Sequence, residues 1–582
     1  MSSKAKIKEK KSISEMGSRA SFRVLKELVG LYILAITCVM PFYFTDGYSH
    51  IGSDKFDFFK NVTLFFGKVV IPVMVIFWIF DLTVKIKNEK TRMGAASKNT
   101  PGFKQIFMKG HIFDLTKFST VDIFVALYGL ILTVSYLTSE FRGAENFWGV
   151  KGWHMGYGTQ MCLVIAYFII SRYWVPHEIY MYLILAVSFV VNLCGLLNRF
   201  GIMVFGMEYS NPSFISTIGN INWFCGYITV TFFIGVYMLF CMELPQKAGK
   251  NANAIKREKA HSKADRKEIL RFVLLNIYVF IGSAMMVAQG SMSGMVATGA
   301  VAAAGLYFSR LDDADLKKVL WEITLFFGSC SALYIIRLIE PDKFNLSDRV
   351  TDILTHTWMP VVLFILSVTL FLVKSLRKIL GKVIKPVIIA GIGVLLLTVI
   401  LIVINTISPG HLGKLSDMAP FTFNESWGSY RGATWMAGAK TFAAQGFKGR
   451  LIGVGPDMMS KALYNQPALE PLKEQMASVF NGATLTNAHN EWLTILVNMG
   501  LFGIMVFGGL EISALKRYLS KKTGIDAAGH DYQRQIMFAG SIGVCLFAYM
   551  INNIFSFEQA MNVTTMFVML GMAEGFMRQI GD

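Results

Sequence analysis

Hydrophobic residues along the chain gather into windows of about eighteen residues or more, separated by short polar loops and by one long polar segment. A window of that length can cross a bilayer as a helix, in which every backbone hydrogen bond is made within the segment. The pattern predicts an all-α polytopic membrane protein. About fourteen transmembrane helices are expected, centred near residues 34, 73, 128, 163, 188, 231, 278, 299, 327, 366, 396, 504, 546 and 568.

These windows divide the chain into four parts. Residues 1–23 are a basic N-terminus, residues 24–407 hold about eleven spans, residues 408–488 are polar, and residues 489–582 hold about three spans. The first span follows the basic segment with no small-residue cleavage site, which predicts an uncleaved anchor. No internal repeat is evident.

The long polar segment is expected to be an ordered cap over the bundle, with short helices, rather than a linker. Residues 431–445 are rich in Ala, Met and Phe and contain no proline, which predicts a short amphipathic helix on the membrane. Gly453, Gly455 and Pro456 then predict a turn.

Basic residues concentrate in alternate loops, near residues 85–117, 243–268, 374–385 and 516–534, whereas the intervening loops are mixed or acidic. Because cytoplasmic loops carry the excess of Lys and Arg, this alternation predicts cytoplasmic N- and C-termini and places residues 408–488 outside. The net charge of +18 is explained by these loops, so no nucleic-acid partner is expected.

Composition narrows the chemistry further. Only 16% of the residues are charged, against about a quarter in soluble domains. The seven cysteines lie in or beside apolar windows without a CxxC pair. Neither a zinc site nor a disulfide framework is indicated.

The first candidate for catalysis is His489, followed by Asn490, where the long polar segment meets the next span. Thr486 or Asn487 is expected to cap that helix, which places His489 in or just before its first turn. Unpaired N–H groups there attract anions and disfavour a second positive charge. The imidazole is therefore expected to be neutral and proton-accepting. The alternative is a satisfied interfacial histidine.

Arg431 is the second candidate, because its fixed charged fork can hold two phosphate oxygens; the alternative is a snorkelling surface arginine. Lys440 and Arg450 are weaker candidates for binding an anion. The backbone at Gly453 and Gly455 could also approach one.

A further polar group stands at the outer end of the sixth predicted span. Asn220 and Asn222 could hydrogen-bond sugar hydroxyls, while the ring of the adjacent Trp223 stacks on a sugar face. Helix capping with an aromatic belt is the alternative. Arg199 also falls near the outer face.

Several of these residues together resemble a known family. His489-Asn490, nine residues, then Gly500-Leu501-Phe502-Gly503 is similar to the H-[NSQ]-x9-G-x-x-G signature of the O-antigen ligase and polymerase superfamily. The two glycines would also let this helix approach a neighbour closely. Three weaker similarities keep the family's order: Gly219-Asn220-Ile221-Asn222, Arg431 with Trp435, and Gly453-Val454-Gly455-Pro456.

The resemblance, over roughly residues 200 to 510, implies a GT-C-like bundle with the large outer loop capping the site. Such proteins move a glycan from undecaprenyl diphosphate to a glycan, lipid or protein acceptor on the outer face of the bacterial plasma membrane. His489 would then deprotonate the acceptor hydroxyl, while arginines stabilise the departing diphosphate, with inversion and without metal or nucleotide. Ligation and polymerisation both remain open.

The chain departs from the family in two ways. Members usually have about twelve spans rather than fourteen. Where many carry Ser-Arg-Ser-Gly, this chain has Ser291-Met292-Ser293-Gly294, so Arg199 substitutes for the missing arginine or the grip on diphosphate is weaker.

Two other functions are compatible with the sequence. A lipid-linked oligosaccharide flippase or other transporter should bury paired charges near mid-membrane; Lys68, Asp122 and Glu322 are candidates without obvious partners. A non-catalytic scaffold for envelope assembly would tolerate changes at His489 and Arg431.

Overall fold

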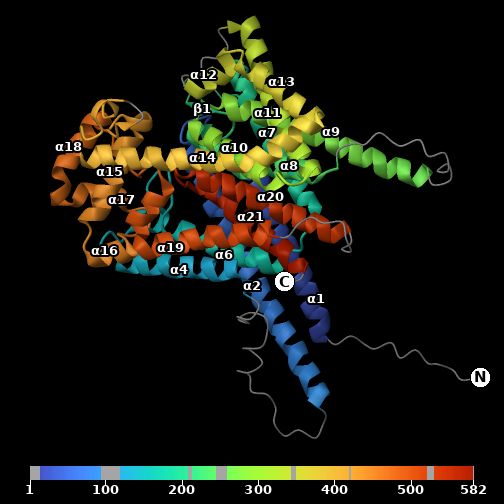
Figure 1. The fold of residues 1–582 in the computed structure, drawn as a ribbon. Helices are drawn as coiled ribbons and strands as arrows, with labels where there is room; N and C mark the ends of the chain where they lie inside the picture. Colours follow the sequence, from blue (N-terminus) through green and yellow to red (C-terminus); the bar gives the residue numbers. More distant parts are fainter. Residues whose placement is uncertain are drawn as a thin grey trace, which may run out of the picture.

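The chain folds into a helical bundle with a smaller group of helices at one end (Figure 1). The computed structural model describes residues 13–93, 118–207, 211, 213–243, 258–341, 349–418, 421–520 and 530–580. The basic loops expected at 85–117, 243–268 and 516–534, and the basic N-terminus, lie partly outside these residues. Within them, the extended elements are β1 (Phe214–Ile215) and β2 (Gly219–Asn220), an antiparallel pair. The all-α prediction is confirmed.

Twelve helices in the described residues are long and apolar enough to cross a membrane, not the fourteen expected. Every predicted centre does fall on a helix. The difference comes from α6 (Tyr157–Tyr173) and α13 (Met359–Leu372), which have 17 and 14 residues. The long helices are α1 (Ile13–Leu34, continued by η1, Ala35–Val39, and η2, Met40–Phe42), α2 (Ile51–Met93), α4 (Thr120–Thr138), α7 (Glu178–Arg199), α8 (Ile221–Cys241), α9 (Glu258–Ala288), α10 (Met292–Ser309), α11 (Asp313–Ile339), α14 (Lys374–Ile407), α19 (Glu491–Leu519), α20 (His530–Asn552) and α21 (Ala560–Gln579).

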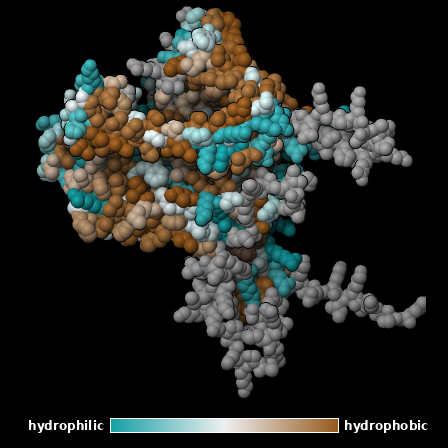
Figure 2. All heavy atoms as spheres, viewed as in Figure 1, coloured by the Kyte–Doolittle hydropathy of each residue, from teal (hydrophilic) through white to brown (hydrophobic). Residues whose placement is uncertain are grey.

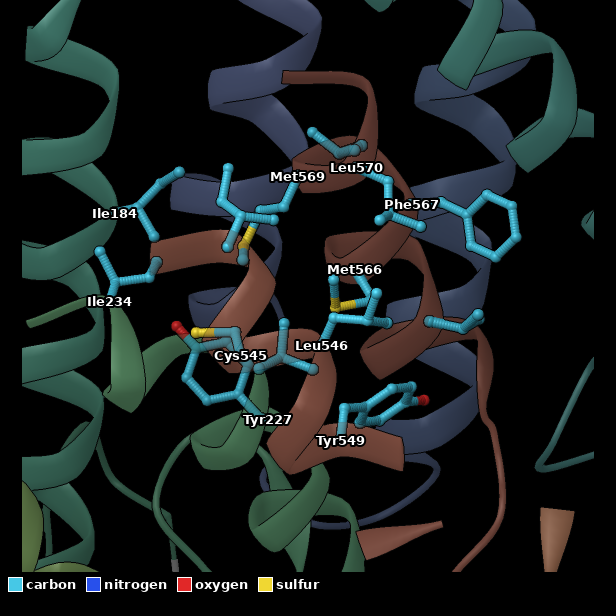
Figure 3. Close-up of a cluster of buried hydrophobic side chains, with 14 of the residues drawn as sticks. Ile184, Tyr227, Ile234, Cys545, Leu546, Tyr549, Met566, Phe567, Met569 and Leu570 are labelled. Carbon is cyan, nitrogen blue, oxygen red and sulfur yellow. The ribbon is translucent and has the colours of Figure 1, made fainter. Parts of the chain in front are cut away.

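The core of the bundle is built around α21, which is buried along its whole length. Met566, Met569 and Leu570 of this helix meet Leu546 and other side chains of α20, α8 and α7 (Figure 3). Close approach needs small residues: a Cβ at Gly226 of α8 would lie 2.2 Å from Asn562 Nδ2 of α21. These packed helices form the support behind the candidate site.

By contrast, α14 has no buried residue in its apolar window. It runs from α10 and α11 toward the smaller helical group (Figure 1), and its surface is mostly hydrophobic, with hydrophilic side chains near its start (Figure 2). Such a helix suits a lipid environment.

The smaller group contains α15 (Trp427–Ala444), α16 (Phe447–Ile452), α17 (Met459–Asn465) and α18 (Glu470–Val479). It has its own apolar core, in which Ala433 and Ala437 of α15 pack with Leu463 and Met476, and with Val497 of α19. The remaining short helices are α5 (Ala144–Trp148), α12 (Arg349–His356), η5 (Gly413–Leu415) and η7 (Pro467–Leu469).

Helix α19 is not one straight helix, because the chain reverses at Gly500, where φ is 69° and ψ is −165°. Residues 491–499, the first arm, fold back on residues 501–519, the second arm. The rings of Trp492 and Phe507 lie 5.4 Å apart, and a Cβ at Gly503 would lie 3.6 Å from Ile495. The second arm alone is long enough to span a bilayer.

This reversal gives the spacing from His489 to Gly500 a physical meaning. Nine residues are two and a half helical turns, so the first arm separates His489 from the reversal by roughly 14 Å. A Cβ at Gly500 would come within 2.5 Å of the backbone of Leu451 and Ile452. Two features therefore require glycine at this position: the positive φ and the close approach of the neighbouring backbone. The neighbour expected to approach Gly503 is the first arm of the same helix.

At the other end of the bundle, five charged side chains form an arginine-paired cluster: Asp122, Glu574, Arg172, Arg517 and Arg578. Arg517 binds Glu574 through two bonds of 2.8 and 3.0 Å, and Arg172 lies 3.3 Å from Asp122. Arg578 contacts both acids. The expectation that Asp122 lacks a partner was wrong, because its partners come from α6 and α21, far away in sequence.

Candidate functional site

The candidate site is assembled around residues 552–558, which connect α20 to α21. Arg431 Nε donates to Phe555 O over 2.8 Å, and the Glu491 N–H donates to Asn553 O over 2.9 Å. The rings of His489 and Phe557 meet edge to face at 4.8 Å. This segment therefore joins the first arm of α19 to α15.

Sequence reasoning missed the 552–558 segment. A signal was present, since Asn552, Asn553 and Ser556 interrupt two apolar windows at the end expected to lie outside. Nothing local indicated that its backbone carbonyls would meet two residues more than sixty positions upstream.

His489 stands immediately before the first arm, as expected, in the left-handed region with φ of 48°. Its N–H donates to Asn487 Oδ1 over 2.9 Å. The helix cap is Asn490, whose Oδ1 accepts from Leu493 N. The expectation of a cap at Thr486 or Asn487 was wrong, because the Asn487 side chain binds the His489 backbone instead.

The electrostatic environment of His489 favours the neutral imidazole. Burial lowers its pKa to about 4, and the positive charge of Arg431 lowers it further in the same direction. Helix-end N–H groups were expected to do this. The structure assigns the effect chiefly to loss of water around the ring.

Arg431 is held by its own local backbone. Gly428, Ser429 and Tyr430 have positive φ values of 59°, 58° and 67°, so the chain turns sharply and Arg431 Nη1 donates to Gly428 O over 3.0 Å. The side chain is half-buried.

The Arg-x3-Trp spacing is explained by a shared contact. Trp435, one turn beyond Arg431 on α15, stacks on Phe555 at 6.1 Å. Residues four apart lie on one face of a helix, so both side chains reach Phe555.

A second polar group reaches the same segment from α8 and α10. Asn220 caps α8 by accepting from Asn222 N over 2.9 Å. Ser291 Oγ donates to Asn222 Oδ1 over 3.1 Å, and Cys225 Sγ donates to Asn552 Oδ1 over 3.3 Å. Ser293 Oγ connects these two bonds, because it lies 3.0 Å from Ser291 Oγ and 3.4 Å from Cys225 Sγ, so Asn222 belongs to the network around residues 552–558.

Arg199 lies just behind this group and is buried. Its Nε and Nη2 donate to Ala288 O and Gln289 O, each over 2.8 Å. These carbonyls directly precede Ser291, so the guanidinium holds the turn that leads into α10.

The remaining basic candidates lie on the smaller helical group. Lys440 is exposed, and Arg450 donates to Ala443 O over 2.6 Å. Within the described residues, neither is hydrogen-bonded to the groups around His489.

Gly453 and Gly455 serve the first arm of α19. Both have positive φ, 77° and 116°. A Cβ at Gly453 would lie 2.1 Å from Asn498 O, and the Gly455 N–H donates to that same oxygen over 3.0 Å. The turn thus pairs with the arm that begins after His489.

An aromatic wall borders the site. Trp153 meets Phe557 at 4.8 Å and Trp223 at 5.8 Å, both edge to face. Trp223, a candidate to stack on a sugar, is therefore linked to His489 through Trp153 and Phe557. Sequence reasoning did not single out Trp153.

Asp457 was also missed, although it directly follows the Gly-Val-Gly-Pro sequence. Its Oδ2 accepts from Val150 N over 2.7 Å and from Met155 N over 3.1 Å, which fixes the loop that carries Trp153. Burial raises the pKa of Asp457 to about 7. In the part of the chain that the structure describes, no group of three or more His, Cys, Asp or Glu is arranged to hold a metal ion.

Comparison with known proteins bears on this arrangement. Residues 350–508 match a family model described as O-Antigen ligase, which confirms the resemblance. The matched stretch extends from α12 into α19 and contains Arg431 and His489. No curated protein sequence matches the chain.

Proposed function

Because residues 350–508 of this multi-pass membrane protein are an O-antigen ligase domain, we propose that it transfers a glycan from undecaprenyl diphosphate to an acceptor hydroxyl. The family carries out lipid-linked glycan transfer of the ligase or polymerase type. The observation that carries the proposal is that His489, a half-buried histidine with a lowered pKa, and Arg431 both contact the 552–558 segment.

In the proposed reaction His489 accepts the proton of the acceptor hydroxyl as that oxygen attacks the anomeric carbon. The bond from this carbon to the diphosphate oxygen breaks, and its electron pair leaves with the diphosphate. Attack from the opposite face inverts the anomeric centre. Arg431 stabilises the charge that develops on the leaving group.

The two residues are electrostatically coupled. Arg431 lowers the pKa of His489 in the free protein. An anionic diphosphate bound at Arg431 offsets that charge and moves the pKa back toward its ordinary value. The base therefore becomes stronger when the donor is bound, which suits proton abstraction during transfer.

The other candidate residues receive different roles in this proposal. In this proposal Asn222 contacts the donor, and the hydrogen bonds that connect it to Asn552 through Ser291, Ser293 and Cys225 support that role. Arg199 acts through the turn before Ser291 as a positioning residue. Asn490 and Asn220 support the starts of α19 and α8.

We further propose the orientation that the basic loops predict, with cytoplasmic termini and α15–α18 outside as a cap over the site. The acceptor is a glycan, lipid or protein hydroxyl on the outer face of the bacterial plasma membrane.

The test is glycan output and lipid-linked glycan in cells that carry His489→Ala. Output should fall by roughly 10² to 10⁴, as for loss of a general base, and the lipid-linked glycan should accumulate on the outer leaflet. His411→Ala, which removes an exposed histidine from the same polar segment, is the matched control. Normal output from a folded His489→Ala protein would overturn the proposal.

The transporter alternative predicts accumulation on the inner leaflet instead. One of its three candidate charges, Asp122, is bound by two arginines at the far end of the bundle. That contact gives it a structural partner, which weakens the case for transport.

A further inference from the structure

A small polar cavity lies against the first arm of α19, next to the candidate site. Its volume is about 20 Å³, enough for about one water molecule. Phe557, whose ring touches His489, forms one wall. The polar lining comes chiefly from Gln160, Asp457, Asn487, Glu491, Asn498 and Glu558, all of them buried.

The lining has more hydrogen-bond acceptors than donors. Asn498 is only 7% exposed, and its Oδ1 has no hydrogen-bond partner among the described residues. None of the lining residues is a Lys or Arg. Three carboxyl groups and an unpartnered amide oxygen around one cavity require hydrogen atoms from elsewhere.

We propose that the cavity holds one water molecule and a proton shared among Asp457, Glu491 and Glu558, and that this unit positions the arm that begins after His489. We call these three residues the carboxyl cluster. The water and the proton follow from the cavity alone, whereas the effect on catalysis rests on the proposed function.

The carboxyl cluster joins three segments that meet at the site. Glu491, the first residue of the arm, accepts from Glu558 N through its Oε2 over 2.7 Å. Asp457 holds the loop containing Trp153, whose ring packs on Phe557. A water among these carboxyl groups ties the arm, the 552–558 segment and that loop together.

The charges around the cluster favour bound protons. Burial raises the pKa of Asp457 to about 7, and the negative charge of Glu145 adds to the effect. Burial raises the pKa of Glu558 well above its usual range, and Glu491 and Glu511 add to it. Two nearby cations make other contacts. Lys461 forms an ion pair with Glu145 over 2.6 Å, and the charge of Arg431 lowers the pKa of His489.

The sign of the pH effect follows. Asp457 and Glu558 keep protons in the folded protein at pH values where the unfolded chain has released them. Their stabilisation is complete at low pH and is lost as pH rises through about 7 for Asp457.

The main experiment measures thermal unfolding of the full chain in lipid nanodiscs between pH 6 and pH 9. The wild-type midpoint should fall with rising pH. Asp457→Asn and Glu491→Gln keep the side-chain shape and supply hydrogen atoms that do not titrate, so their midpoints should depend less on pH. The exposed Glu474→Gln is the matched control. Wild-type pH dependence in both buried variants would overturn the shared proton.

A second variant tests the water. Leu has nearly the shape of Asn but cannot accept a hydrogen bond. If a water is bound, Asn498→Leu should lower the midpoint at pH 6. A higher midpoint would mean that the cavity is dry and would overturn this part.

Infrared difference spectra give a readout that needs no substrate. The carboxylic acid C=O band should be lost as pH rises through the same range, and should be weaker in Asp457→Asn. A spectrum without such a band contradicts the proposal. Because neither measurement uses glycan transfer, both can succeed even if the transferase function fails.

Discussion

Buried acidic residues occur at two ends of this molecule with opposite surroundings. In the arginine-paired cluster, Asp122 and Glu574 are fully buried and lie against three arginines. In the carboxyl cluster, Asp457 and Glu491 are also buried, but their carboxyl oxygens accept hydrogen bonds from backbone N–H groups instead. Acidic side chains are therefore paired with arginines at one end of the molecule, whereas in our proposal they share a proton near His489.

The difference follows from the cost of burying charge. A buried carboxylate needs a partner charge or must take up a proton. Arginines at 172, 517 and 578 compensate the first cluster. Among the described residues, no Lys or Arg lines the cavity of the second cluster, and backbone N–H groups bind its Asp457 and Glu491. In our proposal these carboxyl groups take up protons instead.

The largest effect should come from breaking the arginine-paired cluster. Arg517→Ala leaves Glu574 buried without its two-bond partner, which should lower the free energy of unfolding by about 3 to 5 kcal/mol. Denaturation of purified protein in detergent measures this. The exposed neighbour Lys516→Ala should change stability by less than about 0.5 kcal/mol. An Arg517→Ala protein as stable as that control would contradict the structural role of the cluster.

An intermediate effect is expected for Arg431→Lys, on activity rather than stability. Lysine keeps the charge but loses the planar fork and its fixed donors. Loss of one hydrogen bond to a charged group costs about 1.5 to 3 kcal/mol, so transfer should slow by roughly tenfold to a hundredfold. Initial rates with a purified lipid-linked donor measure it. If the rate stays at the wild-type value, Arg431 does not hold the leaving group.

The smallest effect on activity is expected from lowering the pH. Because the pKa of His489 is lowered to about 4, kcat/KM should change by no more than about twofold between pH 7 and pH 5.5 on account of this residue. Arg431→Gln removes the repelling charge and should move the acidic limb to higher pH. An ordinary histidine limb near pH 6.5 in the wild type would show that the pKa of His489 is not lowered in the folded protein.

The stability of the fold should also depend on pH through His489. Below pH 6.5 the unfolded chain binds a proton at His489 that the folded protein excludes, so this residue destabilises the fold as pH falls from 6.5 toward 4. The carboxyl cluster has the opposite sign and destabilises the fold as pH rises.

Much of the fold could be predicted from local sequence. Each predicted span centre lies on a helix because an apolar run of sufficient length needs no distant partner to be helical in lipid. The count differed at α6 and α13, whose helices have only 17 and 14 residues. Helix length depends on local geometry at the ends, such as the backbone break at Val373.

The position of the candidate site along the chain could be predicted from the sequence, but the contacts between its residues could not. The spacing from His489 to Gly503 pointed to a resemblance to the O-antigen ligase family, and residues 350–508 match the model of that family. The same spacing did not indicate that the chain reverses at Gly500, because a glycine in an apolar run is compatible with a continuous helix. The capping residue was misassigned for a related reason, since Asn487 and Asn490 are equally good caps locally.

The sequence by itself determined that the chain is helical, crosses a membrane many times and carries His489 and Arg431 in one long polar segment, because these features depend on apolar run length and short motifs. Only the tertiary structure decided which groups meet. It brought the 552–558 segment to both residues, gave Asp122 its arginines, and, in the part of the chain that the structure describes, put no Lys or Arg in the lining of the cavity at Asp457 and Glu558. Burial and proximity between distant segments set these charges, and neither is encoded in the spacing of residues along the chain.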